Sequence, residues 1–358
     1  MTGSGNMLGQ GRIRIVLVTK EQRDHDPIEE IIHAADDMQI IGVAKGMQSG
    51  LEMVRALQPE IVLVQNIPEI VDFTSQVRII SNTTGVILLS AASDPVGPQF
   101  IVDALAAGAF DVVKTVDKNN SGSNLLLSKI RCCSIKQYSH QARNGRSAEL
   151  EVKQTSYTFS KAMSSKKYDA VVVGVSTGGP EALLELLPGI PASFPIPIII
   201  VLHMPKEFTG AMALALNRKC KIEVTEAKEG EEALAGHAYI APGGRHCMIE
   251  RAEHNRLQFK LGDGPPENGC RPSVDVLFRS AVSTLGKRGI TVMLTGMGSD
   301  GAIGAGAMKH CGSPILVQDE LSSVVWGMPG SVVRGGFADE ILPLKNIASR
   351  ICELVGAA

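Results

Sequence analysis

The chain has 358 residues, which is enough for two or three domains of ordinary size. Hydrophobic residues make up 44% and charged residues 20%, as in globular proteins, and a net charge of −2 without a basic stripe argues against nucleic acid as a partner. The most apolar stretch, residues 196–202, is much shorter than the roughly 20 residues that a membrane-spanning helix needs. We therefore expect a cytoplasmic protein that is not inserted in a membrane.

The first predicted domain covers residues 12–139, where short β-branched runs alternate with helical patterns. Apolar runs predict strands at 13–18, 40–44, 61–64, 85–89 and 111–113, and a closing helix is predicted over 125–138. Strict alternation of strands and helices predicts a doubly wound parallel sheet with right-handed crossovers. Residues 1–11, which are Gly-rich and polar, lack the apolar core of a secretory signal and are expected to be disordered.

A segment without apolar periodicity follows the first domain. Residues 140–167 are rich in Ser, Gln and Lys, a composition typical of a flexible linker.

The second predicted domain covers residues 168–358 and is again of the α/β class. Buried strands are predicted at 170–175, 196–202, 238–241, 290–294 and 314–317, and a β-hairpin with arms 247–251 and 257–261 is inserted among them. The sequence therefore predicts two doubly wound parallel-sheet domains, the second with an inserted hairpin.

The cysteines are scattered and odd in number, seven in all, and none forms a C-x-x-C pair. In a chain of this length they are expected to be reduced thiols rather than a disulfide framework. The neighbouring His246 and Cys247 could in principle contribute to a metal site, but we expect no metal and no cofactor.

A Gly-rich turn follows the predicted strand 170–175. The run Gly-Val-Ser-Thr-Gly-Gly places Ser176 between that strand and a helix with Pro180 in its first turn. The spacing fits the Gly-x-Ser-x-Gly nucleophile elbow, in which the serine is exposed, and the helix N-terminus suits a developing oxyanion. A phosphate-binding turn is an equal alternative on this motif alone, although no Walker lysine follows.

Two more polar residues follow predicted strands in this domain. His203 comes directly after 196–202, and Asp300 follows 290–294 in a Gly-rich loop. Because the carboxyl ends of parallel strands meet at one edge of a sheet, we expect both to lie near Ser176. We interpret the three as nucleophile, base and orienting acid, and a neutral histidine base predicts activity that rises with pH through roughly 6–7.

Alternatives exist for two of these residues. Asp300 could simply cap the helix that follows it, and His246 could be the base instead of His203. The chain order Ser…His…Asp also differs from that of the α/β-hydrolases, which favours a separate, convergent triad.

Six motifs in this order make the second domain similar to the chemotaxis protein-glutamate methylesterase family. The resemblance implies a triad of Ser176, His203 and Asp300, and oxyanion and substrate loops that contain Thr177 and Met297. The motifs are 173–180 (VGVSTGGP), 203–205 (HMP), 241–246 (APGGRH), 271–278 (RPSVDVLF), 294–302 (LTGMGSDGA) and 318–329 (QDE through GMP).

The first domain is similar to a response-regulator receiver that has lost its phosphorylation residues. Gln65 stands where a receiver has its phosphoacceptor aspartate, and Thr19 and Lys20 stand at its acidic pair. Ser90 and Lys114 roughly keep the switch hydroxyl and the lysine. We therefore expect a pseudo-receiver without a phosphoacceptor. Nearby acids are out of register: Asp24, Asp26 and Glu69.

The resemblance implies hydrolysis of γ-glutamyl methyl esters on the cytoplasmic helices of chemoreceptors, with deamidation of receptor glutamines as a second activity. It also implies a chemotaxis histidine kinase as a further partner in two-component signalling. Two alternatives remain: a signalling adaptor that binds receptors without catalysis, and a nucleotide-binding protein that uses the Gly-rich turn.

Overall fold

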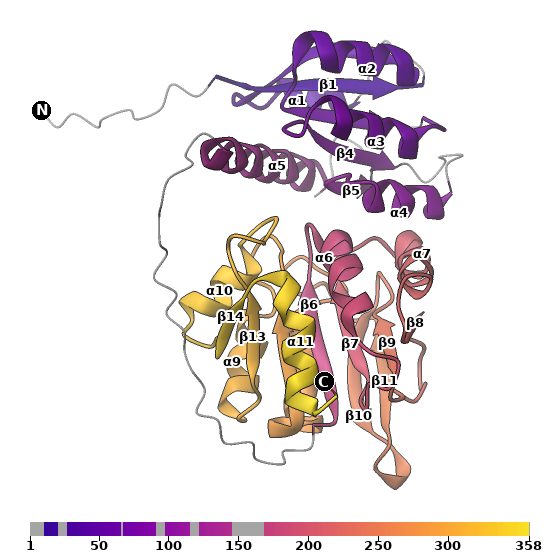
Figure 1. Cartoon of the computed structure of the whole chain (residues 1–358), viewed down its shortest axis with the longest axis vertical. Coiled ribbons are helices and arrows are strands. Elements are labelled where there is room, and N and C mark those ends of the chain that lie inside the picture. The colour runs from indigo at the N-terminus through magenta and orange to yellow at the C-terminus, as the bar shows by residue number, and fades with distance from the viewer. Residues whose placement is uncertain are drawn as a thin grey trace, which may run out of the picture. The chain divides into compact units, whose positions relative to one another are not determined.

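The computed structural model describes residues 11–20, 27–65, 67–90, 97–114, 122–144 and 168–357, with side chains up to Ile135 in the last helix before the gap. The chain divides into two compact units, Met1–Ser147 and Ala148–Ala358 (Figure 1). Residues 1–10 of the predicted disordered N-terminus and 145–167 of the predicted linker lie outside the described residues. Within the described ranges, no helix is both long and apolar enough to cross a membrane.

The first unit is a five-stranded parallel sheet in the order β2-β1-β3-β4-β5. This order is that of the flavodoxin-like doubly wound fold. The last helix runs to Asn144, into the segment 140–167 that was expected to be a linker. The strands are β1 Ile13–Thr19, β2 Met38–Lys45, β3 Ile61–Gln65, β4 Gly85–Ser90 and β5 Asp111–Lys114, and the helices are α1 Pro27–His33, α2 Gly46–Leu57, α3 Ile70–Ile80, α4 Pro98–Ala106 and α5 Gly122–Asn144.

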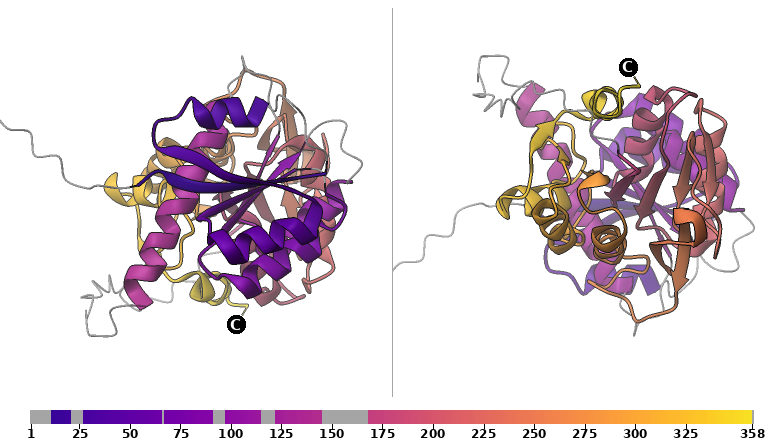
Figure 2. Two further views of the ribbon diagram at one scale, coloured as in Figure 1. Left: turned by 90° about the horizontal axis from the view of Figure 1, so that it is seen from above. Right: turned by 90° about the horizontal axis from the view of Figure 1, so that it is seen from below.

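Helices cover both faces of this sheet (Figure 2). Ile15 and Leu17 of β1 pack in one apolar cluster with Ile28 of α1 and Leu126 of α5, while α3 contacts both α2 and α4. Because both faces are covered, the central strand β3 contains a continuous apolar run, residues 61–64, rather than an alternating pattern.

The second unit is a seven-stranded parallel sheet in the order β14-β13-β12-β6-β7-β9-β8. The chain starts in the middle with β6, builds one side through β7, β8 and β9, and then returns to build the other side from β12. The reversal of strand order therefore lies between β6 and β12. The strands are β6 Ala170–Val175, β7 Ile198–Leu202, β8 Glu223–Glu226, β9 His237–Ile240, β12 Gly289–Met293, β13 Ile315–Gln318 and β14 Glu340–Leu342.

An antiparallel hairpin and one set of helices cover one face of the second sheet. The hairpin packs on α8, and its Ile249 and Phe259 share a core cluster with Val172 of β6 and Phe278 of α8. On the other side, α6 contacts both α7 and α11. The hairpin strands are β10 His246–Arg251 and β11 Leu257–Gly262, and the helices are α6 Gly179–Leu186, α7 Lys206–Asn217, α8 Val274–Thr284, α9 Ala302–His310, α10 Met328–Arg334 and α11 Leu344–Val355.

The predicted fold class, two doubly wound α/β sheets with an inserted hairpin in the second, is confirmed. Two short strands at the edges of the second sheet, β8 and β14, were not predicted. Both are only partly buried and contain glutamates, so they lack the apolar run by which the other strands were recognised.

Candidate active site

Ser176 begins the turn between β6 and α6. Its backbone N–H donates to the Thr295 carbonyl at 3.0 Å, and its own carbonyl accepts from the Gly179 N–H at 2.7 Å. Gly178 has a φ of 77°, and a Cβ on it would come within 2.4 Å of the Val324 side chain, so the turn needs glycine there. Ser176 is only 9% exposed, which corrects the exposed side chain that the elbow motif predicted.

The strand register brings the three predicted residues to one edge of the sheet. Val175 pairs with Leu202, and the His203 N–H donates to the Val175 carbonyl at 3.1 Å. On the other side of β6, the Leu294 N–H donates to the Gly174 carbonyl at 2.9 Å. Ser176 therefore follows the central strand, and the loops that carry His203 and Asp300 follow the strands on either side.

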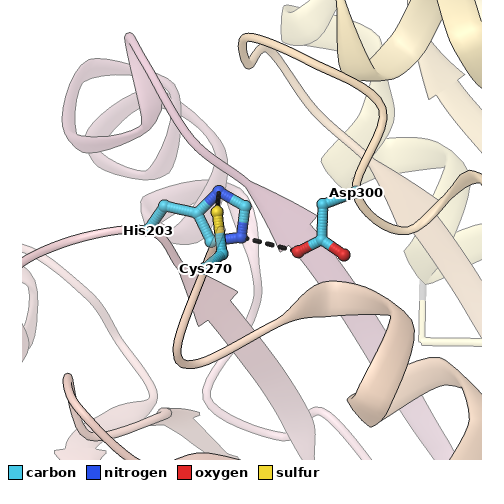
Figure 3. A group of neighbouring side chains, drawn as sticks. All are labelled: His203, Cys270 and Asp300. Atoms are coloured by element: carbon cyan, nitrogen blue, oxygen red, sulfur yellow. Dashed lines mark hydrogen bonds and ion pairs between the residues drawn. The ribbon is translucent and has the colours of Figure 1, made fainter. Parts of the chain in front are cut away.

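His203 and Asp300 are in direct contact. The imidazole Nε2 lies 2.8 Å from Asp300 Oδ2, and Figure 3 shows this carboxylate beside one ring nitrogen and the sulfur of Cys270 close to the other. The His203 side chain is 12% exposed and that of Asp300 is 3% exposed, so water screens this contact only weakly.

Asp300 also caps a helix, although not the one that follows it. Its Oδ2 accepts from the Val274 N–H at 2.7 Å, and its Oδ1 accepts from the Asp275 N–H at 3.2 Å and from the Ser273 hydroxyl at 2.8 Å. These donors form the N-terminus of α8, whose positive end favours a carboxylate. The exposed Asn268 side chain donates a further hydrogen bond to Oδ1 at 3.0 Å. The carboxylate therefore caps α8 and not α9, which was the alternative predicted from the sequence.

Charge and burial shift the pKa values of Asp300 and His203 in opposite directions. Burial by itself raises the pKa of Asp300, but the hydrogen bond and charge of His203 and the donors from Val274 and Asn268 hold that pKa well below its usual range. Burial lowers the pKa of His203, yet Asp300 and Cys270 outweigh it and raise this pKa to about 9. Asp300 is therefore ionised at neutral pH and accepts a hydrogen bond from the Nε2–H of His203. In the neutral form of the imidazole, Nδ1 is then the nitrogen that can take up a proton.

Cys270 is a neighbour of the site that the sequence interpretation missed. Its Sγ lies 3.6 Å from His203 Nδ1, and the residue is only partly buried. Its position just before the 271–278 motif was the available signal, but no strand end or helical period pointed it toward His203. Ser273 and Asn268 were missed for the same reason.

His246, the alternative base, has both ring nitrogens engaged in structural hydrogen bonds. Its Nδ1 accepts from the Ser273 N–H at 3.2 Å, and its Nε2 donates to the Pro265 carbonyl at 3.0 Å. The residue is 5% exposed. Cys247 is fully buried in the core, and burial raises the pKa of its thiol to about 12. This pair is therefore poorly suited to act as base or as a metal site.

The loop that contains Met297 packs directly on Ser176. A Cβ on Gly296 would lie 2.8 Å from the Ser176 Cβ, so Gly296 permits a close approach of the two turns. The Gly296 carbonyl accepts from the N–H groups of Gly327 and Met328 at 3.0 and 2.8 Å, which ties the loop to the start of α10. Met297 is half-buried next to these residues, and Thr177 is 3% exposed on the other side of Ser176.

In the first unit, the residues predicted to stand at the phosphorylation positions of a receiver lie at neighbouring strand ends. Thr19 pairs with Gln65 across β1 and β3, and Ser90 pairs with Lys114 across β4 and β5. Lys20 follows β1 and is exposed. Of the acids that are out of register in sequence, Glu69 precedes α3, whereas Asp24 and Asp26 lie outside the described residues.

Comparisons with known proteins bear on both units. A family model described as CheB methylesterase matches residues 171–351. The protein-glutamate methylesterase/protein-glutamine glutaminase of Trichodesmium erythraeum is 36% identical over 96% of this chain and 99% of that protein. The protein of the same description from Desulfotalea psychrophila is 34% identical over 96% of this chain and 98% of its own length. The crystal structure of the Thermotoga maritima CheB methylesterase catalytic domain is 40% identical, covers 53% of this chain and all of that chain, and has a TM-score of 0.52.

Proposed function

The chain belongs to the CheB methylesterase family, and we propose that it is a hydrolase that cleaves glutamate methyl esters on proteins with Ser176, His203 and Asp300. The observation that carries this assignment is the 2.8 Å contact between His203 and an ionised Asp300 at the same edge of the sheet as Ser176. A histidine oriented by a buried carboxylate beside a serine on a strand-to-helix turn is the arrangement of a serine hydrolase.

The residues act in sequence on the ester. His203 Nδ1 takes the proton of the Ser176 hydroxyl while the oxygen attacks the ester carbonyl. The tetrahedral intermediate collapses to an acyl-enzyme, and the proton on His203 goes to the departing methoxy group, which leaves as methanol. Water, activated by the same nitrogen, then releases the glutamate and restores the serine. Asp300 holds the tautomer and favours the imidazolium.

The oxyanion of the intermediate needs hydrogen-bond donors that are already in place. We assign this role to backbone N–H groups of the turn after Ser176 and of the loop around Met297. The close packing of Gly296 on Ser176 supports this assignment, because it brings that loop next to the Cβ and backbone nitrogen of Ser176.

A second activity is supported by the names of the relatives, which are described as both methylesterases and protein-glutamine glutaminases. Attack of Ser176 on a glutamine side chain would give the same acyl-enzyme, with ammonia instead of methanol as the leaving group. We assign methylated chemoreceptor cytoplasmic helices as the substrate in chemotaxis adaptation and a chemotaxis histidine kinase as a further partner.

The test combines active-site labelling with turnover. The full chain should react with a fluorophosphonate probe and release methanol from methylated chemoreceptor membranes, and Ser176→Ala should abolish both. Ser349→Ala, which removes an exposed serine on α11, is the matched control and should behave like the unaltered protein. Receptor binding without labelling or methanol release would instead favour the adaptor alternative, and labelling that persists in Ser176→Ala would assign the nucleophile elsewhere.

A further inference from the structure

Three potential metal ligands meet in the candidate site, and one of them has no part in the proposed reaction. The Cys270 sulfur lies 3.6 Å from His203 Nδ1, and His203 Nε2 lies 2.8 Å from Asp300 Oδ2 (Figure 3). One ligand atom from each of the three residues lies within 4.8 Å of the others. Since the ester reaction needs only the imidazole and the carboxylate, the thiol calls for another explanation.

We propose that His203, Cys270 and Asp300 form an inhibitory binding site for Zn²⁺ or a cation of similar softness. Imidazole nitrogen, thiolate and carboxylate oxygen are all zinc ligands, and three protein ligands with an open fourth position are a common zinc arrangement. The thiolate and imidazole also select against Mg²⁺ and Ca²⁺, which prefer oxygen ligands only.

The surroundings hold two of the ligands in place. Ser273 and Asn268 donate to Asp300 Oδ1, and the Val274 N–H donates to Oδ2, so the carboxylate stays oriented when its contact with His203 changes. The backbone N–H of His203 is fixed to the Val175 carbonyl. Such contacts around the ligands contribute strongly to metal affinity, because they orient the ligand atoms before the ion arrives.

Binding of one ion requires a rearrangement, because the Cys270 sulfur lies next to Nδ1 of His203 whereas Asp300 lies next to Nε2. An ion bound at Nε2 would lie beside Asp300, and two ligands on one zinc ion lie about 3.3 Å apart, so the 2.8 Å contact between His203 and Asp300 must open slightly. The Cys270 sulfur must also turn from Nδ1 toward Nε2. His203 and Cys270 are both partly accessible, which leaves a path for the ion. Binding replaces the proton between nitrogen and carboxylate and the proton on sulfur, and both protons pass to the solvent.

Binding of the ion would remove His203 as the base of the proposed reaction. An imidazole that coordinates a cation and is separated from Asp300 cannot accept the proton of Ser176 in the required tautomer. Inhibition rests on the proposed function, whereas binding of the ion does not, so the two are measured separately.

The experiment uses the full chain, first freed of metal by a chelator. Titration with Co²⁺ should produce the near-ultraviolet absorption of a thiolate–cobalt bond, and Zn²⁺ should displace the Co²⁺. In parallel, Zn²⁺ should lower the methanol-release rate at least tenfold at saturation, and a chelator should restore it. Cys270→Ser should lose the cobalt–thiolate absorption and need about tenfold or more Zn²⁺ for half-inhibition, because one ligand is gone. Cys311→Ser, which changes an exposed cysteine on the surface, is the matched control.

The outcomes separate this inference from the esterase assignment. Absence of thiolate–cobalt absorption in the unaltered protein, or equal zinc sensitivity in Cys270→Ser and the unaltered protein, would overturn the metal site. Cys270→Ala, with folding checked by circular dichroism, must repeat the loss seen with serine. A protein that shows the cobalt band but never releases methanol would refute the esterase assignment while leaving the metal site intact.

Discussion

At the scale of single residues, the electrostatics of His203 set the pH range in which the site can work. The base must be neutral to accept a proton, but Asp300 and Cys270 outweigh burial and raise the pKa of His203 to about 9. The neutral form is therefore scarce at pH 7 and becomes dominant only above about pH 9. This moves the expected rise in activity from pH 6–7, the range of an unperturbed histidine, to the alkaline side.

We predict that kcat/KM for a methyl ester substrate rises with pH and has a midpoint near 9. Asp300→Asn removes the charge that stabilises the imidazolium, so the midpoint should fall toward that of ordinary histidine, and the plateau rate should fall about 10⁴-fold. A series from pH 5 to 10 measures both. Asp263→Asn, at an exposed acid, is the control and should leave the profile unchanged. An unchanged pH midpoint of kcat/KM in Asp300→Asn would argue against Asp300 as the partner of His203.

His246 gives a second prediction at this scale, which concerns stability rather than chemistry. Its ring joins the Ser273 N–H to the Pro265 carbonyl inside the protein. His246→Ala leaves these groups without partners and should reduce the free energy of unfolding by about 1–3 kcal/mol. Urea unfolding measures this loss, and His33→Ala, at an exposed histidine on α1, should have no effect.

A larger loss of turnover in folded His246→Gln than in His203→Gln would mean that the base is misassigned.

At the scale of elements, the site depends on how closely α8 approaches β6. The three atoms nearest to a Cβ on Gly174 all belong to the Val274 side chain, the closest at 2.4 Å. Gly174 thus allows the first turn of α8 to lie against the strand that carries Ser176. The same turn supplies the N–H groups that bind Asp300, so this contact connects the nucleophile strand to the orienting acid.

We predict that Gly174→Ala reduces the free energy of unfolding by about 1–3 kcal/mol through overpacking. Val274→Ala removes the atoms in the way, so the double variant should lose less stability than the sum of the two single losses. Denaturant unfolding of all variants gives the coupling. Gly210→Ala in α7, where the nearest atom is 3.8 Å away, is the control and should be neutral or slightly stabilising. If the stability loss of the double variant equalled the sum of the two single losses, the contact between Gly174 and Val274 would be contradicted.

At the scale of the whole molecule, the chain joins a unit with the candidate site to a unit that we expect to lack a phosphorylation site. Phosphoryl transfer to a receiver requires a carboxylate acceptor and oxygen ligands for Mg²⁺. The ends of β1 and β3 instead present Thr19, Lys20 and Gln65. An amide cannot form an acyl phosphate, and the ammonium of Lys20 repels the metal.

We therefore predict that acetyl phosphate with Mg²⁺ leaves the esterase rate of the full chain unchanged. Gln65→Asp alone should not create a phosphorylation switch, because the metal ligands are still missing. The fragment 168–358 should remain active, since the Thermotoga maritima catalytic domain, which matches 53% of this chain, forms a crystal structure by itself. A phosphorylated Asp or Glu in residues 12–120, found by mass spectrometry together with a matching rise in rate, would contradict this expectation.

Much of the fold and part of the site could be predicted from the sequence because both leave local patterns. Strands such as β6 and β7 are buried on both faces and appear as continuous apolar runs. Polar residues directly after such runs, Ser176 and His203 among them, must lie at the carboxyl edge of a parallel sheet. The short edge strands β8 and β14 have no such run and were not recognised.

The sequence by itself determined which side chains stand at the strand ends, and the tertiary structure decided which of their neighbours they contact. The partners of Asp300 at the start of α8 precede it by 25 to 27 residues, and Cys270 follows His203 by 67. No period of helix or strand connects positions so far apart in irregular loops. The same packing made His246 a structural residue, nearly covered Ser176 and raised the pKa of His203, because burial and partner charges exist only once the loops have come together.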